Sequence, residues 1–152
     1  MTVSTIILAA GKGTRMRSPT PKILHKIANK HLIAFCVDLA KAVKSKETIV
    51  VIGNENEHAT KVALSDEAVK FCTQKSQLGT GDAVKVALEG FKIKSKYTLI
   101  LYGDTPFIKN HTISKMISKA EKGFEFIFLG FDAGKKIVME NSNLGRKEHS
   151  SI

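Results

Sequence analysis

The sequence predicts an α/β fold: a Rossmann-like, doubly wound and mostly parallel sheet with helices on both faces. Three observations lead to this expectation. Apolar runs rich in Val, Ile and Leu recur along the chain, segments with helical spacing separate them, and glycines and polar residues follow several of the runs. Continuous apolar strands are typical of parallel sheets that are covered on both faces. A length of 152 residues suits a single domain with a substantial core.

Strands and helices are expected to alternate along the chain. The first strand, at 3–9, is rich in β-branched residues, and the first helix, at about 31–44, has apolar residues at helical spacing. Further strands are expected at 48–53, 68–74, 97–104 and 124–131, and further helices at 55–64, 82–91 and 111–122. Right-handed crossovers between parallel strands give a doubly wound fold. In such folds ligands bind beyond the carboxyl ends of the strands.

These elements predict one folded domain over residues 1–131. Residues 132–152 contain one short apolar run and end in polar and charged side chains. They are therefore expected to form a short irregular tail, either a frayed strand or a loop.

Basic residues outnumber acidic ones, with 24 Lys and Arg against 14 Asp and Glu and a formal net charge of +10. Such a surface favours anionic partners, which include nucleic acid, an anionic membrane and a phosphorylated small molecule. The lysines are scattered and no nucleic-acid recognition motif accompanies them, so a lysine-rich solvated surface is the alternative. Two distant cysteines suit a reduced cytoplasm, and no apolar stretch approaches the about 20 residues of a membrane span.

The first strand runs directly into a glycine-rich, basic loop. Gly11 and Gly13 leave backbone N–H groups open to an anion because no Cβ blocks the approach. The spacing matches neither a Walker loop nor the dinucleotide fingerprint, since Lys12 is followed by Gly13 and position 16 is Met16. The loop is either a phosphate-binding loop or a tight turn on a basic surface.

Pro21 directly precedes Lys22, a candidate for contacting a phosphate. Pro21 restricts the preceding residue to extended geometry and stiffens the segment. Lys22 is therefore expected at a fixed position, where a charge-assisted contact to a phosphate loses less entropy.

Two further segments are expected at the same rim. Gln74 ends the third strand and precedes Gly79 and Thr80, so its amide and the loop N–H groups can read the polar edge of a flat ring. The alternative is a helix cap formed by Thr80 or Asp82. Asp104 follows the fourth strand, where it is either a magnesium ligand facing phosphates or an ordinary turn residue.

Taken together, these segments resemble the sugar-1-phosphate nucleotidyltransferases, over about residues 5–131. The motifs are LAAGKGTRM (8–16), PKILH (21–25), QLGTG (77–81) and YGD (102–104). Within that family the resemblance is greatest to the N-terminal uridylyltransferase (pyrophosphorylase) domain of the bacterial bifunctional N-acetylglucosamine-1-phosphate uridylyltransferase/glucosamine-1-phosphate acetyltransferases. It implies a nucleotide-diphospho-sugar transferase type of fold.

The resemblance also implies an activity: transfer of UMP from UTP to N-acetylglucosamine-1-phosphate, giving UDP-N-acetylglucosamine, a peptidoglycan precursor, and pyrophosphate. Arg15 and Lys22 would be the catalytic residues that neutralise phosphate charge, and Asp104 would bind the Mg²⁺ cofactor. The residues that would bind nucleotide and sugar are Leu8, Ala9, Ala10, Gly11, Lys22, Gln74, Gly79, Thr80, Tyr102, Gly103 and Asp104. A cytoplasmic location follows from the same resemblance, with neither membrane nor nucleic acid as a partner.

The resemblance stops after Phe131. The sugar-binding half of the family, with its second metal ligand, and the β-helical acetyltransferase domain have no counterpart in the sequence. The chain is therefore expected to be a truncated nucleotidyltransferase with impaired activity, or a noncatalytic nucleotide-binding or interaction module on the same scaffold. The sugar acceptor, the base and the oligomeric state stay open. Molybdenum-cofactor guanylyltransferases, for instance, share a similar opening loop.

Overall fold

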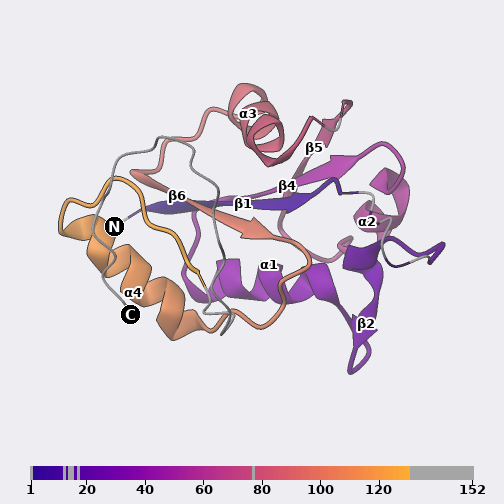
Figure 1. The fold of residues 1–152 in the computed structure, drawn as a ribbon, viewed down its shortest axis with the longest axis horizontal. Coiled ribbons are helices and arrows are strands. Elements are labelled where there is room, and N and C mark those ends of the chain that lie inside the picture. The colour runs from indigo at the N-terminus through magenta and orange to yellow at the C-terminus, as the bar shows by residue number, and fades with distance from the viewer. Residues whose placement is uncertain (1, 12, 14–15, 17, 77, 131–152) are drawn as a thin grey trace, which may run out of the picture.

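A four-stranded parallel sheet lies at the centre of the molecule, in the order β5-β4-β1-β6 (Figure 1). Its strands are β1 (Val3–Ala9), β4 (Thr48–Gly53), β5 (Lys70–Gln74) and β6 (Tyr97–Tyr102). The computed structural model describes residues 2–11, 13, 16, 18–76 and 78–130. All three strand pairings are parallel, so the predicted parallel α/β fold is confirmed.

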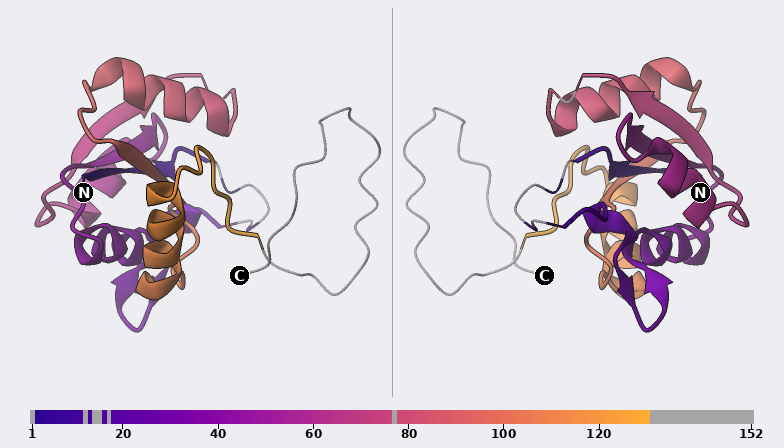
Figure 2. Two further views of the ribbon diagram at one scale, coloured as in Figure 1. Left: turned by 90° about the vertical axis from the view of Figure 1, so that its left-hand side faces the viewer. Right: turned by 90° about the vertical axis from the view of Figure 1, so that its right-hand side faces the viewer.

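Helices cover both faces of this sheet, as Figures 1 and 2 show. One face carries α1 (Leu32–Ala42), α2 (Glu57–Ala63) and α4 (Asn110–Glu121), and the other carries α3 (Thr80–Gly90). The strands supply alternate residues to the two layers: Ile7 packs with the first set of helices and Ile6 packs with α3. The ends of the predicted helices differ from the observed ends by one or two residues.

The segment between β1 and α1 contains structure that the sequence pattern does not predict. A 3-10 turn, η2 (Lys22–Leu24), leads into an antiparallel hairpin of β2 (Lys26–Ile27) and β3 (Lys30–His31). Ala28 and Asn29 form its turn with φ of 48° and 64°, the geometry of a two-residue hairpin turn. The His31 ring lies 2.6 Å from the Leu24 carbonyl oxygen through Nδ1, which ties the hairpin to η2.

The strand expected at 124–131 is wrong for the residues that can be described. Residues 124–130 follow α4 without forming a strand, and Phe126 and Phe128 are 73% and 79% exposed. Alternating phenylalanines fit a strand only where a ladder partner and a covering layer are present. In the described part of the chain no strand pairs with residues 124–130, and the face of β6 that carries Ile100 and Tyr102, 42% and 50% exposed, has no covering layer.

The order of the strands creates a site at one edge of the sheet. The chain runs outward from β1 through β4 to β5, and then returns to the other side of β1 to form β6. Ligands in such folds bind beyond the carboxyl ends of the strands where the order reverses. Among the described residues, no helix has both the length and the apolar character that crossing a membrane requires.

Candidate functional site

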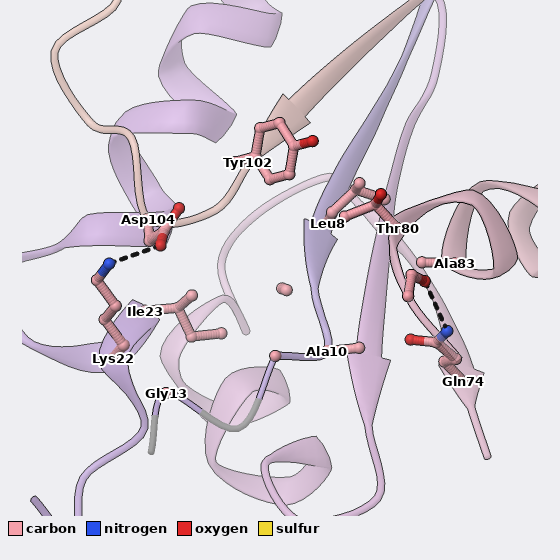
Figure 3. Close-up of a pocket in the computed structure, with 13 residues that line it drawn as sticks. Leu8, Ala10, Gly13, Lys22, Ile23, Gln74, Thr80, Ala83, Tyr102 and Asp104 are labelled. Atoms are coloured by element: carbon pink, nitrogen blue, oxygen red, sulfur yellow. Dashed lines mark hydrogen bonds and ion pairs between the residues drawn. The ribbon is translucent and has the colours of Figure 1, made fainter. Parts of the chain in front are cut away.

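A pocket of about 320 Å³ lies at the carboxyl ends of β1, β5 and β6 (Figure 3). It brings together every predicted site residue except Arg15 and Gly103. Its lining residues are Leu8, Ala9, Ala10, Gly11, Gly13, Lys22, Ile23, Gln74, Gly79, Thr80, Ala83, Tyr102 and Asp104. Four segments that are far apart in the sequence thus form one cavity.

Not every candidate can be placed. Arg15, predicted to be catalytic, lies outside the described residues, as do Lys12 and residues 132–152 of the predicted tail. Gly13 of the predicted glycine loop lines the pocket, and so do Ile23 and Ala83, which the sequence did not indicate. Ile23 and Ala83 carry no polar group, so their types alone gave no functional signal.

The glycine loop packs directly against the segment that carries Lys22. Gly13 has a φ of 60°, and a Cβ at this position would lie 3.1 Å from the Lys22 Cβ. Both the left-handed backbone and the close approach favour glycine here. Gly13 and Lys22 are therefore held side by side before any ligand is considered.

Lys22 and Asp104 form an ion pair at one end of the pocket. The Lys22 Nζ donates to the Asp104 Oδ2 over 2.7 Å, and the two side chains are 41% and 35% exposed (Figure 3). A partly exposed pair of this kind contributes only about 0–1 kcal/mol to stability. The pair can therefore be opened by a ligand at low cost.

Gly103 does not line the pocket, but it fixes the turn between Tyr102 and Asp104. Its N–H donates to the Leu8 carbonyl oxygen over 2.9 Å, and a Cβ at Gly103 would lie 3.2 Å from that oxygen and 3.3 Å from the Ile23 Cγ2. Close packing of the turn against β1 and η2 accounts for the glycine. This contact fixes where Asp104 lies beyond the carboxyl end of β6.

Cys36 of α1 supports the same turn from below. Its thiol donates to the Tyr102 carbonyl oxygen, with a distance of 3.3 Å from Sγ to O. Burial, and then the charge of Asp104, raise the pKa of the Cys36 thiol from 9.0 to about 12. Burial likewise raises the pKa of Cys72 to about 11. Neither thiol is a nucleophile near neutral pH, because nucleophilic attack requires the thiolate.

Gln74 lies at the opposite end of the pocket and is 3% exposed. Its Nε2 donates to the Gly79 carbonyl oxygen over 3.2 Å and to the Asp82 Oδ2 over 2.5 Å. The helix-cap alternative for Thr80 and Asp82 is wrong: α3 begins at Thr80 after the N-cap residue Gly79, and no side chain caps it. Asp82 instead holds the glutamine amide.

Asn56 is a supporting residue that the sequence reasoning missed. It is 5% exposed, its Nδ2 donates to the Ala9 carbonyl oxygen over 2.8 Å, and its Oδ1 accepts from the Gly53 N–H over 3.0 Å. These bonds tie the ends of β1 and β4 together just before the glycine loop. Asn56 also lines a second pocket of about 200 Å³ that shares Ala10 and Gly11 with the first. Asn56 occupies the N-cap position of α2 but makes no side-chain capping hydrogen bond there, so its residue type at a helix start gave no signal of these contacts.

The described residues contain no group of three or more His, Cys, Asp or Glu side chains that could hold a metal ion. Asp104 is the one carboxylate among the described residues that line the main pocket. A single carboxylate suits a metal that takes its remaining ligands from phosphate oxygens and water.

Comparison with known proteins shows the family of the chain. The family model for the MobA-like NTP transferase domain matches residues 5–141. The bifunctional protein GlmU of Parvibaculum lavamentivorans is 38% identical over 129 residues, which cover 84% of this chain and 28% of that protein. Across eight curated GlmU proteins the identity is 36–41%, and the chain spans 26–34% of their length.

Solved structures agree on the fold. A nucleotidyl transferase from Methanothermobacter thermautotroptrophicus has a TM-score of 0.66 at 21% identity, covering 77% of this chain and 57% of that one. Rv0371c from Mycobacterium tuberculosis, solved in complex with manganese, has a TM-score of 0.66 at 18% identity and covers 80% and 61%. The fold is that of the nucleotide-diphospho-sugar transferases. With a family model that matches most of its length, this chain belongs to the MobA-like NTP transferase domains.

Proposed function

We propose that the pocket binds UTP and that the domain transfers UMP to N-acetylglucosamine-1-phosphate, giving UDP-N-acetylglucosamine and pyrophosphate. One observation carries the proposal: the glycine loop, Lys22, Gln74 and Asp104 all face a single cavity at the carboxyl edge of the sheet. The nucleotidyltransferase membership of the chain supports the reaction class. The motifs shared with uridylyltransferases support the base and the sugar.

In this reaction an oxygen of the sugar phosphate attacks the α-phosphorus of UTP in line. A new P–O bond forms, the bond between the α-phosphorus and its bridging oxygen breaks, and pyrophosphate leaves. Such chemistry depends on positioning and charge neutralisation, and it needs no protein nucleophile. The raised thiol pKa values agree with this, because they keep both cysteines protonated.

Lys22 and Asp104 would exchange partners when the substrate binds. Phosphate oxygens would replace Asp104 next to the Lys22 Nζ, and the freed carboxylate would become a ligand for Mg²⁺. The low stability of the partly exposed pair supports such an exchange. Bound Mg²⁺ would supply neutralisation of phosphate charge, and Asp104 would hold it at the end of β6.

The wall of the pocket beside β6 is open in the described part of the chain. Ile100 and Tyr102 are 42% and 50% exposed on the face where α3 covers the neighbouring strands. Positioning of two reactants can contribute about 7–11 kcal/mol to lowering a barrier. We therefore expect the 152-residue chain, tested alone, to bind UTP and to turn it over slowly.

A pyrophosphate-release assay with UTP, MgCl₂ and N-acetylglucosamine-1-phosphate tests the reaction. Release that depends on both substrates, at a rate below the ordinary enzyme range of about 1–10³ s⁻¹, is the expected result. The control is the same assay with the Asp104→Ala variant, which should release none. Release from UTP without the sugar phosphate would contradict the proposal, since it would indicate hydrolysis.

A noncatalytic nucleotide-binding module on the same scaffold is the second candidate. The open wall beside β6 favours it, because an acceptor sugar has few contacts there with described residues. Under this candidate UTP binds but no pyrophosphate is released at any acceptor concentration. The same assay, combined with a binding measurement, separates the two.

A further inference from the structure

We propose that Asp82 sets the base preference of the pocket by fixing the orientation of the Gln74 carboxamide. The inference rests on the proposed function, since it concerns the part of the site that would hold the base. It assigns a positioning role to a residue outside the pocket lining. It also predicts which pyrimidine the site rejects.

The orientation of the amide follows from its two acceptors. A primary carboxamide has two N–H donors on nitrogen and an acceptor oxygen. The Gln74 nitrogen faces two oxygens that can only accept here, the Gly79 carbonyl oxygen at 3.2 Å and the Asp82 Oδ2 at 2.5 Å. Turning the amide over would put its oxygen against both of them. The donor side of the amide is therefore committed to the protein.

This commitment leaves Oε1 as the group that Gln74 offers to a ligand. Gln74 lines the pocket, and Figure 3 shows its oxygen directed away from α3, toward the side where Ala10 lies. The side chain is 3% exposed, so little room exists for it to rotate into another arrangement. The pocket therefore presents a fixed acceptor at this point.

A fixed acceptor distinguishes uracil from cytosine. The N3 position of uracil carries a hydrogen and donates, whereas the N3 of neutral cytosine has a lone pair and accepts. Facing Gln74, cytosine would leave two acceptors against each other in a buried site, and an unpaired buried polar group weakens binding. Because the loss is about 1–3 kcal/mol and 1.4 kcal/mol is tenfold, UTP should bind at least about fivefold more tightly than CTP.

Asp82 could instead matter only as a negative charge in the first turn of α3, where an acidic residue stabilises the helix. Such a charge acts on UTP and CTP alike, because both carry the same phosphates. The ratio of the two dissociation constants therefore reports on the amide and is insensitive to the helix charge.

The experiment is calorimetric titration of UTP and of CTP, with MgCl₂, into the full chain and three variants. Asp82→Ala removes both charge and acceptor, and Asp82→Asn removes the charge but keeps an acceptor oxygen for the Gln74 amide. Glu89→Ala, which removes an exposed acid from the other end of α3, is the control. We expect wild type, Asp82→Asn and Glu89→Ala to prefer UTP by at least about fivefold, and Asp82→Ala to fall to about twofold or less.

An unchanged ratio in folded Asp82→Ala overturns the inference, and so does an Asp82→Asn ratio that falls as far as that of Asp82→Ala. If thermal unfolding shows that Asp82→Ala does not fold, Asp82→Leu, which also lacks an acceptor, replaces it with the same expectation. Equal binding of UTP and CTP by wild type also overturns the inference while nucleotide binding survives. If wild type binds neither nucleotide, the proposed function itself fails, and the role of Asp82 fails with it.

Discussion

At the scale of single residues, three polar side chains of the pocket, Lys22, Gln74 and Asp104, already have protein partners. Lys22 pairs with Asp104, and the Gln74 amide nitrogen pairs with Gly79 and Asp82. A ligand can open the partly exposed ion pair, and the Gln74 oxygen remains available as an acceptor. The sequence motifs predicted Lys22, Gln74 and Asp104 as site residues, and the structure places all three on one pocket. The sequence alone could not predict the contacts among these three side chains, because the contacts depend on distances between segments that meet only in the folded chain.

Replacing Lys22 with alanine should weaken UTP binding by about 1.5–3 kcal/mol, the range for hydrogen bonds to charged groups. The physical reason is the loss of a cation that the adjoining glycine loop and η2 hold in place. Isothermal titration with UTP and Mg²⁺ measures the change. Lys26→Ala is the matched control, since it removes the same charge from an exposed position in β2. An equal loss in both variants would show that only net charge matters.

The thiol of Cys36 should make the protein less stable in alkali. Its pKa is raised to about 12 in the folded state against an ordinary value of 9.0, so between these two pH values the unfolded chain releases a proton that the folded chain keeps. The unfolding free energy should therefore be unaffected below pH 9.0 and fall as the pH rises beyond it, by up to about 1.4 kcal/mol for each pH unit.

Urea unfolding of wild type and Cys36→Val at several pH values measures this effect. The valine variant has no thiol at this position, so its stability should decline less steeply above pH 9.0. Parallel curves for the two proteins would mean that the ionisation of Cys36 is not coupled to folding.

At the scale of elements, the sequence predicted the four strands of the sheet and the four α-helices, with ends displaced by one or two residues. Period and composition suffice for such elements because each is at least five residues long. The short hairpin of β2 and β3 is too brief to show a period. The expected strand at 124–131 failed over its described residues because a strand needs a partner, and local pattern does not reveal one.

Asn56 joins two of these elements, and its removal should loosen the start of the glycine loop. Asn56→Ala would leave the Ala9 carbonyl and the Gly53 N–H without their side-chain partner in a buried place, which costs about 1–3 kcal/mol of stability. Hydrogen exchange of the backbone amides of Ala10 and Gly11 should also become faster. Asn54→Ala, exposed in the same loop, is the control. Unchanged exchange in a destabilised Asn56→Ala protein would limit Asn56 to a general role in stability.

At the scale of the whole molecule, the sheet is covered by three helices on one face and by α3 on the other. The face of β6 beside α3 stays open among the described residues, and it borders the pocket at Tyr102. The chain spans 26–34% of the GlmU proteins that it resembles. The fold and most residues of the pocket were accessible from the sequence because their motifs lie in continuous segments. Turnover depends on how a second substrate is held, and no motif of the chain specifies that.

The most direct test of the account is a calorimetric titration of the full chain with UTP and with GTP, each in the presence and absence of Mg²⁺. We predict one UTP per chain, tighter binding with Mg²⁺ because one carboxylate forms a poor metal site until phosphates complete it, and weaker binding of GTP. Mg²⁺ alone should bind weakly. Absence of UTP binding, or GTP binding as tight as that of UTP, would contradict the assignment of the pocket as a uridine nucleotide site.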